Sequence, residues 1–327
     1  MTPLVKRLAE GVGPFTVAGL LYAGAAGLAL AAGRGAEETP VRRKDLPRVA
    51  VVAFFGAFLA PVFLAAGLGR TSGTSASLLL NMEAVFTVAL GALVHREPVA
   101  RRVWLAVGVI ALGGVSVSLA PGTEAGSTTA LGAGLVACAT LGWALDNTLS
   151  RPLADLDPGG VVTWKGGSGA ALSFAVAIAQ GEGVPPAWAA LGVLACGAIG
   201  YGASLRLYLR AQRILGAART GSVFAVAPFL GALAALSLGE SIDGTAAIAG
   251  GALMALGVYL HLTETHEHEH HHPALTHDHP HCHDDGHHDD HDHEGLARGT
   301  LHSHPHEHSP RTHRHAHGED VHHRHHG

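Results

Sequence analysis

Apolar residues fill long stretches of this chain, and short polar turns separate them. Residues 71–121 contain two such stretches on either side of a turn centred on His95-Arg96-Glu97-Pro98. An apolar run of about 20 residues is long enough to cross the roughly 30 Å hydrocarbon layer of a bilayer as a helix. The pattern therefore predicts a hairpin of two membrane-spanning helices in this region.

The same pattern recurs along most of the chain and predicts nine helices. They lie near residues 13–33, 47–69, 74–95, 102–120, 129–150, 160–180, 186–209, 213–238 and 244–262. Of the 327 residues 48% are hydrophobic and 14% are charged, and most of the charge lies after residue 260. The part before residue 260 is more apolar than a soluble domain of that size tolerates. We therefore expect an all-α integral membrane protein that has the lipid bilayer as its surroundings.

An internal repeat relates the two halves of the apolar region. At a shift of 143 positions the aligned pairs are Glu97 with Glu240, Phe86 with Phe229, Gly108 with Gly251, and Gly114 with Gly257. The apolar runs on both sides of these residues stay in register. Self-similarity of this kind indicates two related structural units.

The repeated unit is an apolar run that ends in Glu and is followed by a Gly-rich apolar run, and it resembles the EamA-type repeat of the drug/metabolite transporter superfamily. Matching blocks in the second half are CATLGWALDNTLSR, the Lys-Gly of VVTWKGG, and YGASLRLYLRAQRILGAARTGSVFAVAPFLGA. The resemblance extends to about His261. It implies a first EamA-like repeat in residues 1–121, a second in residues 122–262 and a separate tail in residues 263–327.

The start of the chain bears on the helix count. In the resembling family a Thr-Pro-Leu-x-Lys sequence, like that of residues 2–6, closes the first helix of a ten-helix chain. The resemblance thus implies that a further helix precedes Met1 in the parent gene. The nine helices would then be four plus five of a five-plus-five arrangement. A genuine nine-helix member is the alternative.

Loop charge predicts the orientation in the membrane, because short loops rich in Lys and Arg stay in the cytoplasm. These residues gather in the first, third and seventh loops: Arg34, Arg42, Arg43, Lys44, Arg48, Arg96, Arg101, Arg102, Arg210, Arg213 and Arg219. We expect a multi-pass protein of the inner (plasma) membrane with a cytoplasmic C-terminal tail. Five helices in each half would place the second repeat upside down relative to the first, which suits a carrier with one central site.

Six polar residues stand inside the apolar runs: Asn81, Glu83, Asp146, Asn147, Lys165 and Arg206. An ionisable side chain at mid-bilayer costs at least about 2.5–3.5 kcal/mol, so each one predicts a partner or a function. In one interpretation the acids and bases only neutralise one another within the bundle. In the other, some of them form a substrate or proton site.

Glu83 and Lys165 are the leading candidates for such a site, since both lie well inside apolar stretches. Asp146 ranks lower because it is closer to Arg151 and the helix end. Arg206 lies one helical turn from Arg210 and could extend to the membrane surface. We expect Glu97 and Glu240, at equivalent helix ends, to cap a helix or form local ion pairs.

The tail from His266 to Gly327 is rich in histidine, Asp and Glu and contains hardly any apolar residue. Such a segment cannot bury a core, so we expect it to be disordered. Neutral imidazole binds divalent nickel, zinc, cobalt and copper. The candidate ligands are His266, His268, His270, His277, His279, His281, Cys282, His283, His302, His304, His306 and His308. Without fixed spacing the tail cannot select among these metals. The alternative is a solvated extension with incidental metal affinity.

Two classes of function remain open. The first is an alternating-access transporter, with export as the expected direction, of a small metabolite, a metal or a metal complex. The second is a membrane-anchored metal-buffering or sensing protein without transport. An enzyme is not expected, because no nucleophile-base set and no cofactor fingerprint is visible. We expect no required cofactor and no nucleic-acid partner, and a homodimer stays open beside a monomer.

Overall fold

A computed structural model describes most of the chain. The described residues are 1–33, 38–94, 99–119, 129–153, 156–215, 223–240 and 244–263, together with the backbone of four segments in the tail. Residues up to Glu264 and residues Thr265–His317 form two separate units.

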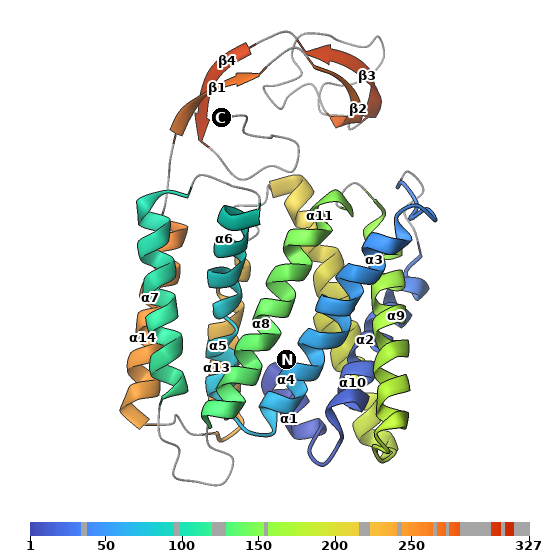
Figure 1. Cartoon of the computed structure of the whole chain (residues 1–327), viewed down its shortest axis with the longest axis vertical. Helices are drawn as coiled ribbons and strands as arrows, with labels where there is room; N and C mark the ends of the chain where they lie inside the picture. Colours follow the sequence, from blue (N-terminus) through green and yellow to red (C-terminus); the bar gives the residue numbers. More distant parts are fainter. Residues whose placement is uncertain are drawn as a thin grey trace. The chain divides into compact units, whose positions relative to one another are not determined.

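The first unit consists of helices that lie side by side (Figure 1). Their bounds are α1 Thr2–Leu8, α2 Pro14–Ala31, α3 Leu46–Ala53, η1 Phe54–Leu59, α4 Ala60–Leu68, α5 Gly73–Leu79, α6 Met82–Val94, α7 Arg101–Ser118, α8 Ala130–Ser150, η2 Arg151–Leu153, α9 Pro158–Ala179, α10 Ala187–Gly197, η3 Ala198–Ala203, α11 Ser204–Leu215, α13 Ala227–Ser237 and α14 Gly244–Leu262. η1 and η3 are π-helical and η2 is a 3₁₀ turn.

Within the described part of the chain, seven helical segments are long and apolar enough to cross a membrane. They are Pro14–Ala31, Leu46–Leu68, Gly73–Val94, Arg101–Ser118, Pro158–Ala179, Ala187–Tyr208 and Gly244–Leu262. α8 is not among them, because Asp146 and Asn147 lower its hydropathy, and the described part of α13 is short. The expected all-helical membrane region is confirmed, whereas the count of nine helices stays a prediction.

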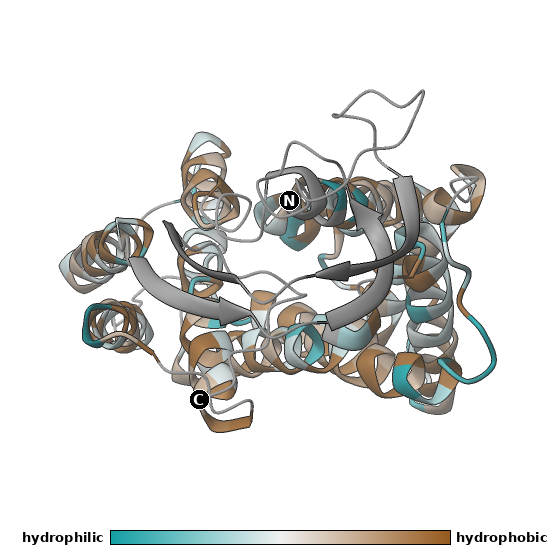
Figure 2. Cartoon of the chain, turned by 90° about the horizontal axis from the view of Figure 1, so that it is seen from above, coloured by the Kyte–Doolittle hydropathy of each residue, from teal (hydrophilic) through white to brown (hydrophobic). Residues whose placement is uncertain are grey.

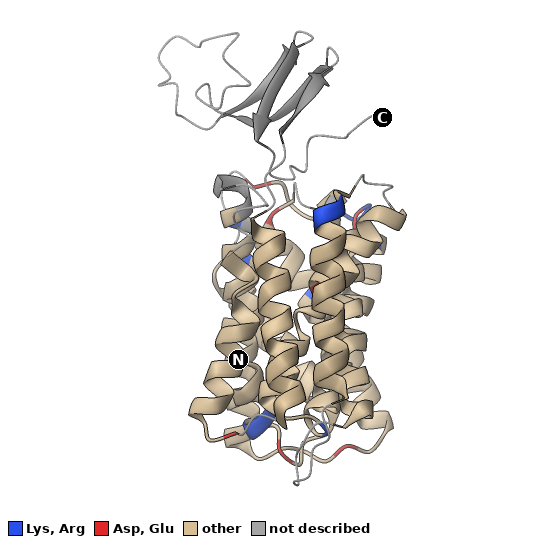
Figure 3. Ribbon diagram, turned by 90° about the vertical axis from the view of Figure 1, so that its left-hand side faces the viewer, with Lys and Arg blue, Asp and Glu red and all other residues tan. Residues whose placement is uncertain are grey.

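Apolar residues cover the helices on their outer as well as their inner faces (Figure 2). Leu105, Ile178 and Leu191 are examples of large apolar side chains that are exposed on the first unit. Helices that are apolar all round are typical of proteins surrounded by lipid. Charged residues are concentrated towards the two ends of the helices (Figure 3), as a membrane-spanning bundle requires.

α7 and α14 pack closely and run in opposite directions. A Cβ atom at Gly113 would lie 2.7 Å from the carbonyl oxygen of Gly250, so only glycine permits this approach. Near the start of α7, the Arg102 guanidinium donates to Thr263 Oγ1, just after α14, at 2.7 Å. Small residues allow such close backbone contact where no hydrophobic effect drives helices together. The final helices of the two repeats are therefore antiparallel partners.

α2 and α9 form a second antiparallel pair. Thr16, near the start of α2, bonds to Glu182 after the end of α9. At the other end, the carbonyl oxygen of Gly33, after α2, lies 3.3 Å from the position of a Cβ atom on Gly159, near the start of α9. Each helix of the pair begins with a proline, Pro14 and Pro158, 144 positions apart. These helices are equivalent members of the two repeats.

The two π-helical turns are also equivalent. η1 and η3 interrupt the α3–α4 and α10–α11 stacks at a shift of 144 positions. π-Helical turns are rare, and they occur frequently at functional sites. Their recurrence in both repeats indicates that the repeat extends to backbone geometry.

The structure describes the backbone of four segments of the tail. β1 Glu267–His272 pairs with β4 Arg311–Ala316, and β2 Leu275–His281 pairs with β3 His302–His308, both antiparallel. Backbone hydrogen bonds between extended strands provide this pairing. Disorder of the tail as a whole stays a prediction. The rest of the tail lies outside the described residues.

Candidate functional site

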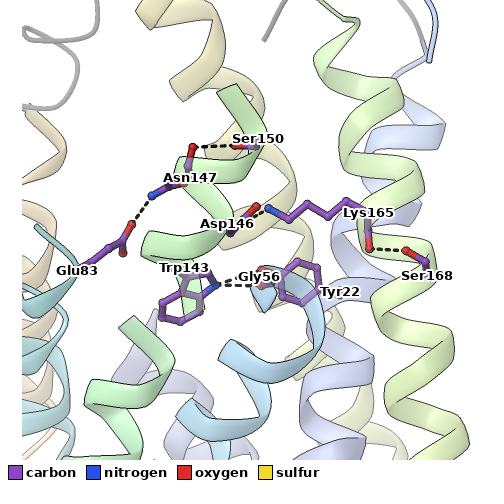
Figure 4. Close-up of polar contacts among 9 residues, drawn as sticks. All are labelled: Tyr22, Gly56, Glu83, Trp143, Asp146, Asn147, Ser150, Lys165 and Ser168. Carbon is purple, nitrogen blue, oxygen red and sulfur yellow. Dashed lines mark hydrogen bonds and ion pairs between the residues drawn. The ribbon is translucent and has the colours of Figure 1, made fainter. Parts of the chain in front are cut away.

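A buried ion pair joins α8 and α9. The Lys165 ammonium contacts the carboxylate of Asp146 through Oδ2 (Figure 4). Only 3% of Asp146 and 7% of Lys165 is exposed. Charges this deep are tolerated in pairs, whereas removal of one partner leaves a buried charge without compensation. The structure thus brings together two of the residues predicted from sequence.

The second oxygen of this carboxylate has an unusual environment. Asp146 Oδ1 is buried and has no hydrogen-bond partner among the described residues. Buried polar atoms almost always have a partner, because leaving one unpaired costs free energy. A proton, or a donor group of a bound solute, would satisfy this oxygen.

Glu83 and Asn147 form a second polar contact next to the pair. Asn147 Nδ2 on α8 donates to Glu83 Oε1 on α6 at 2.8 Å. Asn147 is exposed and Glu83 is half-buried, in contrast with Asp146 and Lys165. Figure 4 shows Asp146 and Asn147 pointing to opposite sides of α8, towards Lys165 and Glu83 respectively. A shift or rotation of α8 would therefore alter both contacts together.

A backbone carbonyl of the π-helical turn η1 supports the site. Gly56 O accepts from Tyr22 Oη at 2.5 Å and from Trp143 Nε1 at 3.1 Å. The Tyr201 ring of η3 lies beside both rings, at centroid distances of 5.3 Å from Tyr22 and 6.2 Å from Trp143. A Cβ atom on Gly56 would lie 2.1 Å from Asp146 Oδ2, so this position requires glycine.

The site lies between the two repeats. Tyr22, Gly56 and Glu83 come from α2, η1 and α6 of the first repeat. Trp143, Asp146, Asn147, Lys165 and Tyr201 come from α8, α9 and η3 of the second. In membrane carriers built from repeats, the solute site lies at such an interface, near the middle of the bilayer.

Two further predicted residues make contacts outside this cluster. Asn81 Nδ2 donates to Leu78 O at 3.0 Å, where the chain passes from α5 to α6. Arg206 donates to Ala29 O at 3.4 Å and to Gly33 O at 3.1 Å, at the carboxyl end of α2. A cation is favourable there, because the last carbonyls of a helix carry partial negative charge. Within the described part of the chain, neither side chain forms a hydrogen bond or ion pair with Asp146, Lys165 or Glu83.

The side chains of the metal ligands predicted in the tail lie outside the part of the chain that the structure describes. His266, Cys282 and His283 lie outside the described residues, and the structure describes only the backbone of the others. Among the side chains that are described, no group of three or more His, Cys, Asp or Glu residues could hold a metal ion. Metal binding by the tail stays a prediction.

Sequence reasoning missed Tyr22, Gly56, Trp143 and Tyr201. One signal was present, because the chain has only four Trp and four Tyr residues, and Trp143 lies one helical turn before Asn147. No local pattern marks Gly56, whose role depends on a π-helical turn and on a carboxylate from another helix.

The fold and the site define a multi-pass helical membrane protein built from two repeats around a buried polar cluster. The chain belongs to the EamA-like transporter family, whose model matches residues 1–119 and 130–263. This result confirms the resemblance seen in the sequence.

Two individual proteins are similar to the chain. An uncharacterized transporter of Methanothermobacter thermautotrophicus is 29% identical over 123 residues, which cover 37% of this chain and 36% of that protein. The match thus spans about a third of the relative's length. A solved structure described as "Crystal structure of protein" superposes with a TM-score of 0.55 at 20% identity, covering 79% of this chain and 92% of the other. That similarity concerns the fold alone.

Proposed function

We propose that the protein is a carrier that moves a small solute across the membrane by alternating access, with export as the expected direction. The observation that carries this proposal is the polar cluster formed by Asp146, Lys165, Glu83 and Asn147 between the two repeats. Ionisable groups in membrane helices typically mark substrate or proton pathways.

The antiparallel pairing of equivalent helices supports an inverted repeat. An axis along the membrane normal would make equivalent helices parallel, whereas an axis in the membrane plane makes them antiparallel. α2 with α9 and α7 with α14 are both antiparallel. Inverted repeats can exchange conformations and thereby open one site to either side in turn. We place the protein in the inner (plasma) membrane, with the Lys- and Arg-rich first, third and seventh loops and the tail on the cytoplasmic side.

The site suggests a division of roles. Glu83 lies on the side of α8 where Asn147 is exposed to the surroundings of the helices. A donor group of the solute could replace the Asn147 amide as the hydrogen-bond donor to Glu83. Asp146 and Lys165 lie deeper, where transfer of a proton to the carboxylate would release the ammonium to hold an anionic group. These residues suit a small polar metabolite or a metal complex better than a bare transition metal, which prefers His or Cys ligands.

Replacing Glu83 with Gln tests this function. Cells expressing the full chain, Glu83→Gln or Glu10→Gln would be supplied with labelled amino acids, nickel, zinc and cobalt, and their solute content measured. Glu10 is an exposed carboxylate and serves as the matched control. Hydrogen bonds to charged groups contribute about 1.5–3 kcal/mol, so we expect a roughly 10- to 100-fold loss of flux for one solute with Glu83→Gln alone. No response from any solute would contradict the assignment of the site.

A membrane-anchored metal buffer is the second candidate function. The backbone register sets His277 opposite His306, His279 opposite His304, and His281 opposite His302. Positions opposite one another in antiparallel strands are near neighbours, so the register places histidines in pairs. Such pairs favour binding of nickel, zinc, cobalt or copper.

Removal of the tail after Thr263 distinguishes the two functions. If the protein is a buffer, truncation should abolish metal tolerance, whereas Glu83→Gln combined with Lys165→Met should leave tolerance unchanged. If it is a carrier, the double variant should abolish flux and truncation should preserve transport of any solute that is not a metal. Metal content of the cells and flux would be measured side by side.

A further inference from the structure

A surface pocket of about 440 Å³ lies between the start of α3 and the end of α8. Lys44 precedes α3, Arg48 lies in its first turn, and Leu149 lies in the last turn of α8. The pocket combines two cations and one carboxylate with three apolar residues: Lys44, Asp45, Pro47, Arg48, Val51 and Leu149. None of these residues belongs to the polar cluster around Asp146.

The two cations of the pocket have no partner within the described part of the chain. The side chains of Lys44 and Arg48 are exposed, and they form neither an ion pair nor a hydrogen bond there. The carboxylate of Asp45 accepts the Arg42 backbone N–H through Oδ2 at 2.9 Å. Over residues 42–48, four cations stand against this one carboxylate. The pocket therefore attracts an anionic group from outside the protein.

Cations at the opposite end of the bundle are partnered within the protein. Lys6 Nζ lies 3.4 Å from Glu240 Oε1, and the Arg7 guanidinium donates to Leu238 O. The sequence prediction that Glu240 caps a helix or forms an ion pair is thus confirmed, whereas Glu97 lies outside the described residues. The start of α3 differs from this end, because its cations are left to groups of the surroundings.

An apolar strip continues from the pocket along α3. Pro47, Val51 and Phe54 stand at positions i, i+4 and i+7, so they share one face of the helix. Val51 is 48% exposed and Phe54 is 43% exposed. At 1.5 Å per residue the strip runs about 10 Å along the helix axis. It belongs to the segment Leu46–Leu68, which is long and apolar enough to cross a membrane. The cations thus stand at the level of the lipid headgroups, above a strip that faces acyl chains.

We propose that this pocket binds an anionic phospholipid. Lys44 and Arg48 bind the phosphate of the headgroup, and Pro47, Val51 and Phe54 contact an acyl chain. The adjoining strip favours a lipid over a soluble phosphate compound, which has no apolar part to cover it. Basic pockets between membrane helices on the cytoplasmic side typically bind anionic headgroups, and the proposed orientation places the first loop on that side. The inference requires this placement in the membrane but does not depend on solute transport.

Lipid binding to the purified full chain tests the site. The protein in detergent would be titrated with dioleoyl phosphatidylglycerol or dioleoyl phosphatidylcholine, and the bound lipid counted by native mass spectrometry. Each Lys or Arg near a membrane surface strengthens binding of anionic lipid about 5-fold. We therefore expect Lys44→Gln and Arg48→Gln each to weaken binding of phosphatidylglycerol about 5-fold, and the double variant to weaken it roughly 25-fold. Phosphatidylcholine should bind more weakly and respond to neither substitution.

A second double variant removes the same charge outside the pocket. Arg101→Gln combined with Arg210→Gln changes two exposed arginines and should leave the affinity for phosphatidylglycerol within about twofold. All four substituted side chains are exposed, so both double variants should elute as a single species with the stability of the wild type.

Three outcomes would overturn the proposal. The first is wild-type affinity for phosphatidylglycerol in the variant that lacks both Lys44 and Arg48. The second is an equal loss in the control variant, which would show general attraction to surface charge. The third is displacement of the lipid by an equal concentration of inorganic phosphate, which would show that the pocket holds a soluble phosphate group.

Discussion

Replacing Lys165 with methionine should lower the free energy of unfolding by about 3–5 kcal/mol, because it leaves the Asp146 carboxylate buried without its counter-charge. Methionine has a similar length and is apolar, so the change removes the charge with little change in packing. Equilibrium unfolding of the purified protein in detergent measures the effect. Lys44→Met, at an exposed lysine, is the control and should change stability by less than about 0.5 kcal/mol.

A double variant distinguishes the cost of an unpaired buried charge from the cost of altered packing. Adding Asp146→Asn to Lys165→Met removes the remaining charge, so most of the lost stability should return. Solute flux should nevertheless be abolished in this double variant, because both charges of the site are gone. A Lys165→Met variant as stable as the wild type would show that the two side chains do not form a buried ion pair.

Replacing Gly56 with alanine should lower solute flux strongly, with a smaller loss of stability than Lys165→Met causes. The new methyl group would lie 2.1 Å from Asp146 Oδ2, so the carboxylate or the π-helical turn must move. Overpacking of this kind costs about 1–3 kcal/mol. We expect a flux loss of about 100-fold, since the displaced carboxylate can no longer bind Lys165 as it does here.

Gly27→Ala is the matched control for this substitution. Gly27 lies inside α2, and a Cβ atom there would meet no other atom within 4 Å. Alanine is about 0.5–1 kcal/mol more favourable than glycine within a helix, so this variant should be as stable as the wild type or slightly more stable. Equal flux in Gly56→Ala and Gly27→Ala would show that the contact between η1 and Asp146 has no part in transport.

The membrane-spanning helices were predictable from the sequence because the hydropathy of each segment largely determines whether it spans the bilayer. The apolar runs marked the helices to within a few residues, for example 160–180 for α9, which spans Pro158–Ala179. Charges within those runs were equally visible, and Glu83, Asp146 and Lys165 all take part in the observed cluster.

The partners within the site were not predictable, because contacts between helices depend on how the helices rotate and cross. Asp146 ranked as a weaker site candidate because it is close to Arg151 in the sequence. In the structure its side chain points into the bundle and contacts Lys165. Arg206, also a candidate from the sequence, binds the carboxyl end of α2 in the structure. Gly56 gave no signal, since its importance arises only when α8 lies against η1.

Accessibility of Asn147 tests the central claim most directly. Asn147→Cys, in a chain without other cysteines, would be exposed to a water-soluble thiol reagent added from either side of the membrane. Because Asn147 is exposed beside the buried pair, the account predicts reaction from both sides, each slowed by the transported solute. Reaction with a lipid-soluble maleimide alone, and with no water-soluble reagent from either side, would contradict it, because the cluster would then face acyl chains.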